Sequence, residues 1–325
     1  MFIDMSKDQV TISDIEQAHG RIAAVARRTP LERPLWLANE SGRAVWLKME
    51  CFQTTGSFKL RGAVSRLSAL TESERARGVL TVSAGNHGLA VAHSASLLGI
   101  DATIVVPRTA SRAKVEAIAR YPVTLIERGE NYDEAERAAR ELERQGEKLF
   151  VSPYNDPYVI AGQGTAGLEI IMDEPRLEAI LVPTGGGGLL AGVAIAVKAL
   201  MPHIEVYGVE STASPSMLRS LEAGRIVEIE EEESIADGLA GNIEQDSITF
   251  PIIKHLIDGI VLVNEASIRR AVARMAREEH VMIEGAAAAG LAALDDERFK
   301  DYRVAAIITG RNITLDLFQA VTGGK

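Results

Sequence analysis

The fold is decided by the stretch PTGGGGLLAG, which runs from Pro183 to Gly192. The apolar run Ile180–Pro183 that leads into it is typical of a strand buried on both faces, and the apolar residues after the glycines predict a helix. Consecutive glycines let backbone amides approach one anion closely, and the N-terminus of a helix favours negative charge. We therefore expect a phosphate-binding turn in an α/β domain. No Gly-Lys-Ser/Thr follows, which excludes a nucleoside-triphosphate P-loop.

Outward from this turn, short apolar runs alternate with longer amphipathic segments. This alternation predicts an α/β fold with parallel sheets and helices on both faces. The predicted strands are Ala44–Met49, Val79–Ser83, Thr103–Pro107, Val123–Glu127, Leu149–Ser152, Ile180–Pro183, Glu205–Glu210, Ile260–Val263 and Val304–Ile308.

Several helix ends are predicted by local signals. Ser13 and Glu16 have the spacing of a capping box. Asn264 is a candidate N-cap for a helix over Glu265–Glu279. Gly99 stands where a C-terminal glycine would end the helix that begins near Asn86.

The composition is that of a globular protein, with 325 residues of which 46% are hydrophobic. The formal net charge of -10 argues against nucleic acid or an anionic membrane as a partner. No stretch reaches about 18 uncharged apolar residues, so we expect no transmembrane helix. The single cysteine, Cys51, cannot form an internal disulfide, and the stretch MFIDMSKDQVTISD lacks the apolar region of a secretory signal. We therefore expect a cytoplasmic enzyme that acts on small molecules.

A candidate reactive lysine lies in the stretch KMECFQTTGSFKLRGA, Lys48 to Ala63. A strand ends, a polar turn follows, and Ser57-Phe58-Lys59 opens a helical pattern. The positive field at a helix N-terminus helps Lys59 to lose its proton, and a neutral amine is what attack on an aldehyde requires. Taken alone, any lysine is more simply interpreted as a solvated surface amine, so the surrounding motifs carry the assignment.

Two further predicted strands end in polar residues. In VSAGNHGLA, Val82 to Ala90, backbone amides and the Asn86 side chain lie where anions bind in open α/β sheets. His87 could act as a base, but a packed or capping histidine is the favoured interpretation. In IITGRN, Ile307 to Asn312, Thr309 could hydrogen-bond a ligand ring nitrogen, with a simple strand-end turn as the alternative.

The glycines Gly162, Gly164 and Gly167 fit the pattern G-x-G-x-x-G. The residues before them do not form a clean strand pattern, and no neighbouring strand carries an acidic residue at the required distance. This is therefore a weak dinucleotide-binding signal, which we discard.

The motifs TGSFK, SAGNHG, VIAGQGT and the glycine tetrad, in this order, resemble those of fold-type II pyridoxal-phosphate enzymes. The similarity covers nearly the whole chain and is to the threonine/serine dehydratase and serine racemase branch. It implies a two-domain α/β fold like that of the tryptophan synthase β subunit. The large cofactor-binding domain would comprise residues 1–70 and 157–325, and a small mobile domain residues 71–156.

The resemblance implies that Lys59 is the catalytic residue and carries pyridoxal 5'-phosphate as a Schiff base. It implies cofactor contacts by Phe58, Lys59, Asn86, Gly185, Gly186, Gly187, Gly188, Leu189, Gly238, Glu284 and Thr309. It assigns the substrate carboxylate to Ser83, Ala84, Asn86 and His87. A neutral hydroxyl at Thr309 does not hold the pyridine ring protonated, which suits β-elimination.

The implied activity is that of a lyase, which converts L-threonine, L-serine or both into a 2-keto acid and ammonia. A serine racemase is the nearest alternative, followed by a dehydratase of another β-hydroxy amino acid. The segment DGLAGNIEQDSITFP, Asp237 to Pro251, is similar to a subgroup linked to hydroxyectoine breakdown. A non-catalytic binding protein is the distant alternative, and Lys59 with the intact glycine tetrad argues against it. We expect a small-molecule substrate, no nucleic-acid or membrane partner, and a homodimer.

Several positions depart from the family pattern. Racemases carry a second serine after Ser83, whereas Ala84 has no proton to exchange, so the dehydratase is favoured. Racemases of this branch bind a divalent cation through a Glu and a nearby Asp, but Ser211–Ser216 next to Glu210 contains no acidic residue, so we predict no metal. At three positions Cys51 replaces the usual Asn, Leu89 the common Gln and Arg311 the common Gly, which leaves the preferred substrate open.

Overall fold

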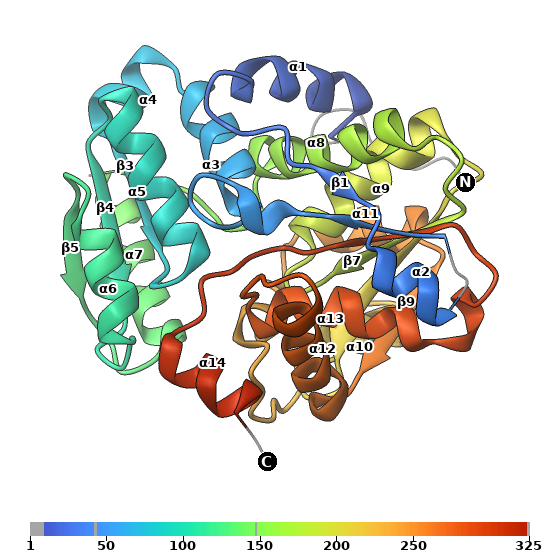
Figure 1. Ribbon diagram of the computed structural model, residues 1–325. Helices are drawn as coiled ribbons and strands as arrows, with labels where there is room; N and C mark the ends of the chain where they lie inside the picture. The colour runs from blue at the N-terminus through green and yellow to red at the C-terminus, as the bar shows by residue number, and fades with distance from the viewer. Residues whose placement is uncertain (1–9, 42–43, 147, 324–325) are drawn as a thin grey trace.

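The computed structural model describes residues 10–41, 44–146 and 148–323, which form two sheets flanked by helices (Figure 1). The larger sheet has the strand order β1-β2-β10-β7-β8-β9, and the smaller sheet has the order β5-β4-β3-β6. Within these residues every ladder is parallel except the one between β1 and β2. The strands are β1 (Leu31–Glu32), β2 (Val45–Lys48), β3 (Val79–Val82), β4 (Ala102–Val106), β5 (Thr124–Glu127), β6 (Leu149–Phe150), β7 (Ala179–Pro183), β8 (Glu205–Ser211), β9 (Gly259–Val263) and β10 (Val304–Ile307).

The helices connect successive strands and cover both faces of each sheet (Figure 1). They are α1 (Ile12–Ile22), α2 (Leu35–Ser41), α3 (Lys59–Ser68), α4 (Glu72–Arg77), α5 (Asn86–Leu98), α6 (Arg112–Ala119), α7 (Tyr132–Arg144), α8 (Pro157–Asp173), α9 (Gly188–Leu200), α10 (Ser216–Ala223), α11 (Thr249–Leu256), α12 (Glu265–Glu278), α13 (Gly285–Ala292) and α14 (Leu315–Thr322). A short 3-10 turn, η2 (Asp237–Leu239), precedes α11.

The larger sheet separates two hydrophobic cores, because successive side chains of a strand point to opposite faces. From β7, Ile180 and Val182 pack in the core that contains α8 and α9. From the same strand, Ala179 and Leu181 pack in the core that contains α12 and α13. Burial on both faces explains why β7 is apolar at every position, and it confirms the predicted parallel sheet with helices on both faces.

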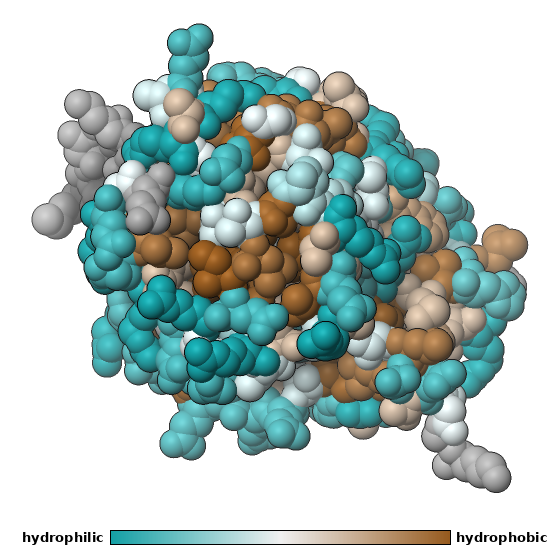
Figure 2. All heavy atoms as spheres, turned by 90° about the vertical axis from the view of Figure 1, so that its left-hand side faces the viewer, coloured by the Kyte–Doolittle hydropathy of each residue, from teal (hydrophilic) through white to brown (hydrophobic). Residues whose placement is uncertain are grey.

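The smaller sheet is formed by residues 79–150 and has its own two cores. Ile104 contributes to the core on the side of α5 and α6, and Val105 to the core on the side of α7. The face on this side of the molecule has hydrophobic atoms near its centre and a mostly hydrophilic rim (Figure 2). The edge strand β5 is the least buried of the four, with Leu125 and Ile126 only half-buried.

All nine predicted strands are confirmed, with ends displaced by at most two residues. The antiparallel strand β1 was not predicted, because two residues are too few for a periodic pattern. Asn264 is confirmed as the N-cap of α12, and Gly99 ends α5 in the left-handed conformation with φ of +64°.

The capping box predicted at Ser13 and Glu16 is wrong. Thr11 caps α1, and Asp14 completes the box with its backbone and side chain. Both pairs have the required spacing. The earlier start brings Ile12 into the helix, where it packs against the core that contains α8 and α9.

The discarded glycine pattern lies inside α8, where it permits close packing of helices. A Cβ atom on Gly162 would lie 2.5 Å from the Arg61 carbonyl oxygen of α3, and one on Gly164 would lie 2.8 Å from the Gly192 carbonyl oxygen of α9. These glycines are therefore not a dinucleotide-binding loop.

The described helices include none that is long and apolar enough to cross a membrane. The absence of a secretory signal was predicted from a stretch whose first nine residues lie outside the described residues.

Candidate active site

The glycine tetrad forms the turn between β7 and α9. Gly187 has φ of +86°, a conformation that favours glycine, and a Cβ atom on Gly186 would lie 2.4 Å from the ring of Tyr154. The backbone amides of Gly185, Gly186 and Gly187 donate no hydrogen bond to another described residue. With Leu189 in the first turn of α9, these unused donors point to an anion site at a helix N-terminus.

Lys59 is the first residue of α3, and the loop before it pairs with the segment after β10. Ser57 forms a bridge with Gly310, and the Phe58 amide donates to the Thr309 carbonyl oxygen at 3.0 Å. The Lys59 amine donates to the Pro153 carbonyl oxygen at 2.9 Å. Since Pro153 precedes Tyr154, which packs on the glycine turn, the structure brings Lys59 and the tetrad to one site.

Burial sets the protonation of the Lys59 amine. Desolvation lowers the pKa of Lys59 to about 8, and the nearby carboxyl group of Glu284 opposes this change. At pH 7 about one in ten such amines is neutral, whereas an ordinary lysine is neutral in fewer than about one in a thousand. The Phe58 ring lies beside the amine, with its centroid 5.2 Å from Nζ.

Asn86 and Glu284 face each other between the two sheets. Asn86 begins α5, and its Nδ2 donates to Glu284 Oε1 at 2.7 Å. Desolvation raises the pKa of Glu284 to about 7, and the negative charge of Asp237 adds to the rise. The carboxyl group therefore changes charge close to neutral pH, and it is near enough to Lys59 in space to raise the pKa of that amine.

The turn from β3 to α5 contains the residues predicted to hold a carboxylate. Ser83 Oγ accepts a hydrogen bond from the Gly85 amide at 3.1 Å, and Ala84 is half-buried beside it. A Cβ atom on Gly88 would lie 2.0 Å from the Ser83 carbonyl oxygen, so the tight turn requires glycine there. The amides at the start of α5 therefore face the end of the strand.

His87 is packed in the interior, as the sequence favoured. Its Nε2 lies 3.2 Å from the Val151 carbonyl oxygen, and only 3% of the residue is exposed. Desolvation lowers the pKa of His87 to about 3, so the imidazole is neutral. Nε2 is committed to Val151, whereas Nδ1 has no hydrogen-bond partner among the described residues, and the charge of nearby Lys59 helps to keep the ring neutral.

The remaining predicted residues converge on the same region. Thr309 is buried after β10, and Gly238 in η2 lies so close to the tetrad that a Cβ atom on Gly185 would be 3.4 Å from its carbonyl oxygen. The described residues thus bring together all the motifs that the sequence singled out, except the glycines of α8.

Three residues of the site were not predicted: Pro153, Tyr154 and Asn312. Asn312 Nδ2 donates to the Thr55 carbonyl oxygen at 2.9 Å and to Asn86 Oδ1 at 2.6 Å. The Tyr154 hydroxyl accepts from the Glu244 amide at 3.0 Å. Pro153 and Tyr154 stand in no local chemical motif, and Asn312 ends the IITGRN stretch without a signal of its own, so only the order of the strands brings these three residues to the site.

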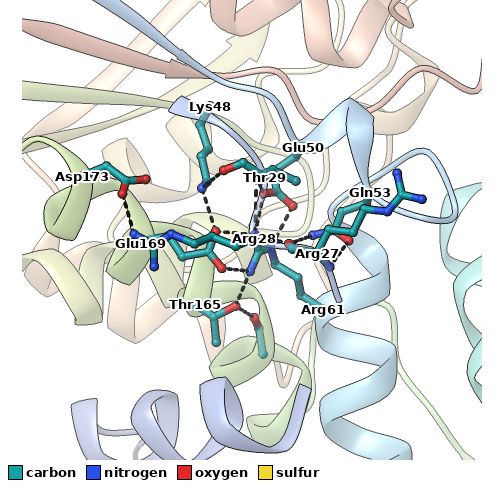
Figure 3. Close-up of polar contacts among 11 residues, drawn as sticks. Arg27, Arg28, Thr29, Lys48, Glu50, Gln53, Arg61, Thr165, Glu169 and Asp173 are labelled. Atoms are coloured by element: carbon teal, nitrogen blue, oxygen red, sulfur yellow. Dashed lines mark hydrogen bonds and ion pairs between the residues drawn. The ribbon is translucent and has the colours of Figure 1, made fainter. Parts of the chain in front are cut away.

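A buried network of charged side chains lies behind the lysine loop (Figure 3). The Arg61 guanidinium contacts Glu50 at 2.8 Å and Glu169 at 2.7 Å, and the Lys48 amine contacts Glu169 at 2.6 Å. All four side chains are at most 3% exposed, and their formal charges cancel. The network joins β2, α3 and α8, so it fixes the helix on which Lys59 sits.

Glu210, the possible metal ligand, is buried at the end of β8. Its two carboxylate oxygens accept the Met217 and Leu218 amides of α10, each at 2.8 Å. Desolvation raises the pKa of Glu210 to about 7. The part of the chain that the structure describes contains no group of three His, Cys, Asp or Glu side chains placed to hold a metal.

Comparison with known proteins identifies the family to which this site belongs. Residues 22–310 match the family model described as pyridoxal-phosphate dependent enzyme. The chain belongs to this family. Pyridoxal phosphate is therefore its cofactor.

Curated relatives and solved structures support the assignment of this chain to the family of pyridoxal-phosphate enzymes. It is 41% identical over 313 residues to L-threonine ammonia-lyase of Thermotoga maritima, with 96% of this chain and 78% of the relative covered. It is 37% identical over 318 residues to the catabolic L-threonine dehydratase of Escherichia coli K12, with 97% and 96% covered. The structure of maize serine racemase has a TM-score of 0.91 and 33% identity, with 97% of both chains covered.

These similarities confirm the predicted fold class, a fold-type II pyridoxal-phosphate enzyme of the threonine/serine dehydratase and serine racemase branch. The glycine turn fits the phosphate of the cofactor, because it offers unused amides at the positive end of α9 and has no room for a Cβ atom at Gly186.

Proposed function

We propose that this enzyme is an ammonia-lyase that converts L-threonine, L-serine or both into a 2-keto acid and ammonia by β-elimination. The observation that carries the proposal is the position of the Lys59 amine, whose pKa is lowered to about 8, beside a turn of unused glycine amides. The relatives named L-threonine ammonia-lyase and L-threonine dehydratase support the choice of reaction.

We propose that the cofactor phosphate is held by Gly185, Gly186, Gly187, Gly188 and Leu189, and that Phe58, Asn86, Gly238, Glu284 and Thr309 surround the ring. Bound pyridoxal phosphate supplies an electron sink for the electron pair left at the substrate Cα atom. Thr309 is a neutral hydroxyl, which favours a modest sink and therefore rapid expulsion of a leaving group.

The chain's own residues supply the rest of the reaction. In its neutral form Lys59 accepts the Cα proton, since burial keeps its pKa near neutrality. The backbone amides of Ser83, Ala84, Asn86 and His87, together with the side chains of Ser83 and Asn86, bind the substrate carboxylate at the start of α5. The β-hydroxyl group takes up a proton as its bond to Cβ breaks and leaves as water, so the substrate has lost its Cα proton and a hydroxide in all. The released aminoacrylate then reacts with water to give the keto acid and ammonium.

We also propose that residues 71–156 form a small domain that closes over the substrate and excludes water. The contact between Lys114 of α6 and Asp237 of η2, at 2.6 Å, supports this proposal because it spans the two sheets near Glu284. A mobile small domain would make and break this pair during each turnover.

A dehydratase is preferred to a racemase because of Ala84. Racemisation needs an acid/base group on each face of the substrate Cα atom, and the methyl group of Ala84 cannot exchange a proton. The segment Asp237–Pro251, which is similar to a subgroup linked to hydroxyectoine breakdown, contacts Tyr154 and Asn155 beside the site. Dehydration of another β-hydroxy amino acid, such as a hydroxyectoine derivative, is therefore kept as the alternative.

We propose a homodimer in the cytoplasm, in line with the branch that the sequence resembles. The single cysteine, Cys51, is free and buried, which fits a reducing compartment. Light scattering of the purified chain measures the assembly directly, and a monomer of 35.0 kDa at working concentration would contradict it.

The test is a keto acid assay on the cofactor-loaded enzyme with L-threonine, L-serine and larger β-hydroxy amino acids. We expect turnover of threonine or serine, no turnover by Lys59→Ala, and wild-type turnover by Lys300→Ala, which changes an exposed lysine. Formation of D-serine from L-serine, without keto acid, would replace the lyase by a racemase. Normal turnover by Lys59→Ala would overturn the assignment.

A further inference from the structure

A chain of amide and carboxyl groups crosses the candidate active site, from the lysine loop to the start of α13. The Asn312 amide donates to the Thr55 carbonyl oxygen at 2.9 Å and to Asn86 Oδ1 at 2.6 Å. Asn86 then donates to Glu284 Oε1 at 2.7 Å. The four residues come from four separate segments of the fold, so the chain of hydrogen bonds forms only in the completed molecule.

The direction of this chain is set by its first acceptor. A backbone carbonyl can only accept, so the group of Asn312 that faces Thr55 must be the NH2 group. The second hydrogen on that nitrogen points to Asn86, which must therefore present its oxygen to Asn312. The NH2 group of Asn86 is thereby turned toward Glu284. One hydrogen on Asn86 Nδ2 binds Glu284, which leaves the other for a ligand.

The position of Asn312 is itself tightly defined. A Cβ atom on Gly56 would lie 2.6 Å from Asn312 Oδ1, so glycine is required for the two segments to approach. The Arg311 amide donates to the Gly56 carbonyl oxygen at 2.9 Å, and Phe58 pairs with Thr309 next to it. Asn312 is thus held against the lysine loop by its neighbours and is not free to turn.

From these contacts we infer that Asn312 is a positioning residue that fixes the side-chain amide of Asn86 with its NH2 group toward the cofactor. An amide in the opposite orientation would present an oxygen, and two facing oxygens without a hydrogen between them repel each other. The inference rests on the proposed placement of the cofactor beside Lys59. It assigns to Asn312 a role that acts only through Asn86.

The test is a double-mutant cycle on binding of pyridoxal phosphate to the cofactor-depleted full chain. Asn312→Ala and Asn86→Ala should each raise the Kd of pyridoxal phosphate about tenfold, the loss expected for one hydrogen bond to a charged group. The double variant should bind no more weakly than Asn86→Ala. A Kd unchanged in Asn312→Ala, or a double variant weakened by the product of the two effects, would overturn the inference.

A merely structural role is separated by two further measurements. Asn264→Ala removes a side-chain hydrogen bond at the exposed N-cap of α12, so it should lower the unfolding temperature and leave the Kd unchanged. Asn312→Asp keeps the size of the side chain, but an ionised carboxylate attracts the NH2 group of Asn86 and turns its oxygen outward. We expect this variant to shift the visible absorbance maximum of the bound cofactor, and an unshifted spectrum with unchanged Kd contradicts the inference.

Binding is measured here without turnover, so this inference and the proposed reaction fail separately. Non-additive binding effects in a protein that released no keto acid would support the role of Asn312 and sink the ammonia-lyase assignment. Additive binding effects in an enzyme that releases keto acid would overturn the role of Asn312 and leave the ammonia-lyase assignment in place.

Discussion

At the scale of single residues, Lys59 shows how burial prepares an amine for chemistry. Desolvation disfavours its charged form, while Glu284 partly restores that form. The two groups have pKa values of about 8 and about 7, so each changes charge within the range where enzymes work. The charge state of the lysine amine is therefore set by its burial and by one neighbouring carboxyl group.

The first prediction concerns the rate at which the cofactor-depleted chain captures pyridoxal phosphate. Only the neutral amine attacks an aldehyde, so the rate should rise with pH through a midpoint near 8. In Glu284→Gln the carboxyl group that raises the Lys59 pKa is gone, and the midpoint should move to lower pH. Stopped-flow absorbance measures both midpoints. A midpoint near 10, as for a free lysine, contradicts the assigned environment.

The second prediction concerns stability. The pKa of Lys59 is lower in the folded chain than in the unfolded chain, so its contribution is fully present only above about pH 10. That contribution is lost as the pH falls through about 8. At pH 7 the cofactor-depleted variant Lys59→Met should therefore be more stable than the wild type, by about 3 kcal/mol.

Urea denaturation of the cofactor-depleted proteins tests this second prediction. Lys300→Met, at an exposed position, is the matched control and should stay within about 0.5 kcal/mol of the wild type. If Lys59→Met is less stable than the wild type, burial of the Lys59 amine does not lower the free energy of unfolding, and the prediction is wrong. A gain in stability with loss of activity is the usual balance at an active site.

At the scale of elements, the buried network in Figure 3 joins β2, α3 and α8. Its four charged side chains are hydrogen-bonded to one another and buried, in a position where apolar side chains are the usual filling. Desolvation opposes ionisation of Arg61, but Glu50 and Glu169 raise its pKa well above the usual range. The guanidinium therefore stays charged and holds both carboxylates in fixed positions.

The third prediction is that Arg61→Met lowers the free energy of unfolding by about 3–5 kcal/mol, because it leaves two buried carboxylates with too few partners. Arg28→Met removes the exposed pair of Arg28 with Asp173, drawn in the same figure, and should cost at most about 1 kcal/mol. Chemical denaturation of both variants gives the comparison. Equal losses would show that the buried network contributes no more than a surface pair.

The elements were largely predictable from the sequence because nine of the ten described strands lie in local stretches rich in apolar residues. Runs such as Ile180–Pro183 have nearly every side chain buried, so their composition alone distinguishes them. The strand β1 and the cap of α1 were missed or misplaced for a different reason. Leu31–Glu32 gains its conformation from pairing with β2, and the choice between Thr11 and Ser13 depends on which face of α1 is buried.

At the scale of the whole molecule, the site lies between a larger sheet and a smaller one formed by residues 79–150 (Figure 1). Asn86 comes from the smaller unit, while Lys59 and the glycine tetrad come from the larger. Motion of one unit against the other would change the distance between the groups that bind substrate and the group that moves the proton.

The fourth prediction concerns the pair that spans the two units. Lys114→Met removes an exposed contact worth about 0.2–1 kcal/mol, so KM for the amino acid should rise about two- to fivefold. Lys148→Met removes a contact of similar length, 2.7 Å, between Lys148 and Asp101 within the smaller unit, and should leave KM unchanged. Steady-state kinetics at low and high salt measures the effect, which salt should reduce in the wild type. An equal response of both variants would exclude a role of Lys114 in closure.

The site was predictable only where its residues carried a motif of their own. Lys59 and the tetrad stand in stretches whose local chemistry is unusual. Tyr154 and Pro153 do not, and Asn312 ends the IITGRN stretch without a signal of its own, because the partners Gly186, Lys59 and Asn86 are supplied by other segments of the chain. Contacts of this kind follow from strand order, which a single sequence does not specify.

The order of the strands also determines when, during synthesis, the chain can bind pyridoxal phosphate and take on its yellow colour. The smaller sheet is formed by one continuous segment of the chain. In the larger sheet, β2 can be joined to β7 only after β10 has been synthesised, because β10 lies between β2 and β7. As the chain leaves the ribosome the smaller sheet can form first, and the long-range closure of the larger sheet comes late. The loop before Lys59 is held by backbone pairing with Thr309 and Gly310, directly after β10. A nascent chain in which β10 has not yet been synthesised therefore lacks a complete site for pyridoxal phosphate. The yellow colour of bound pyridoxal phosphate thus marks a molecule whose synthesis has passed that strand.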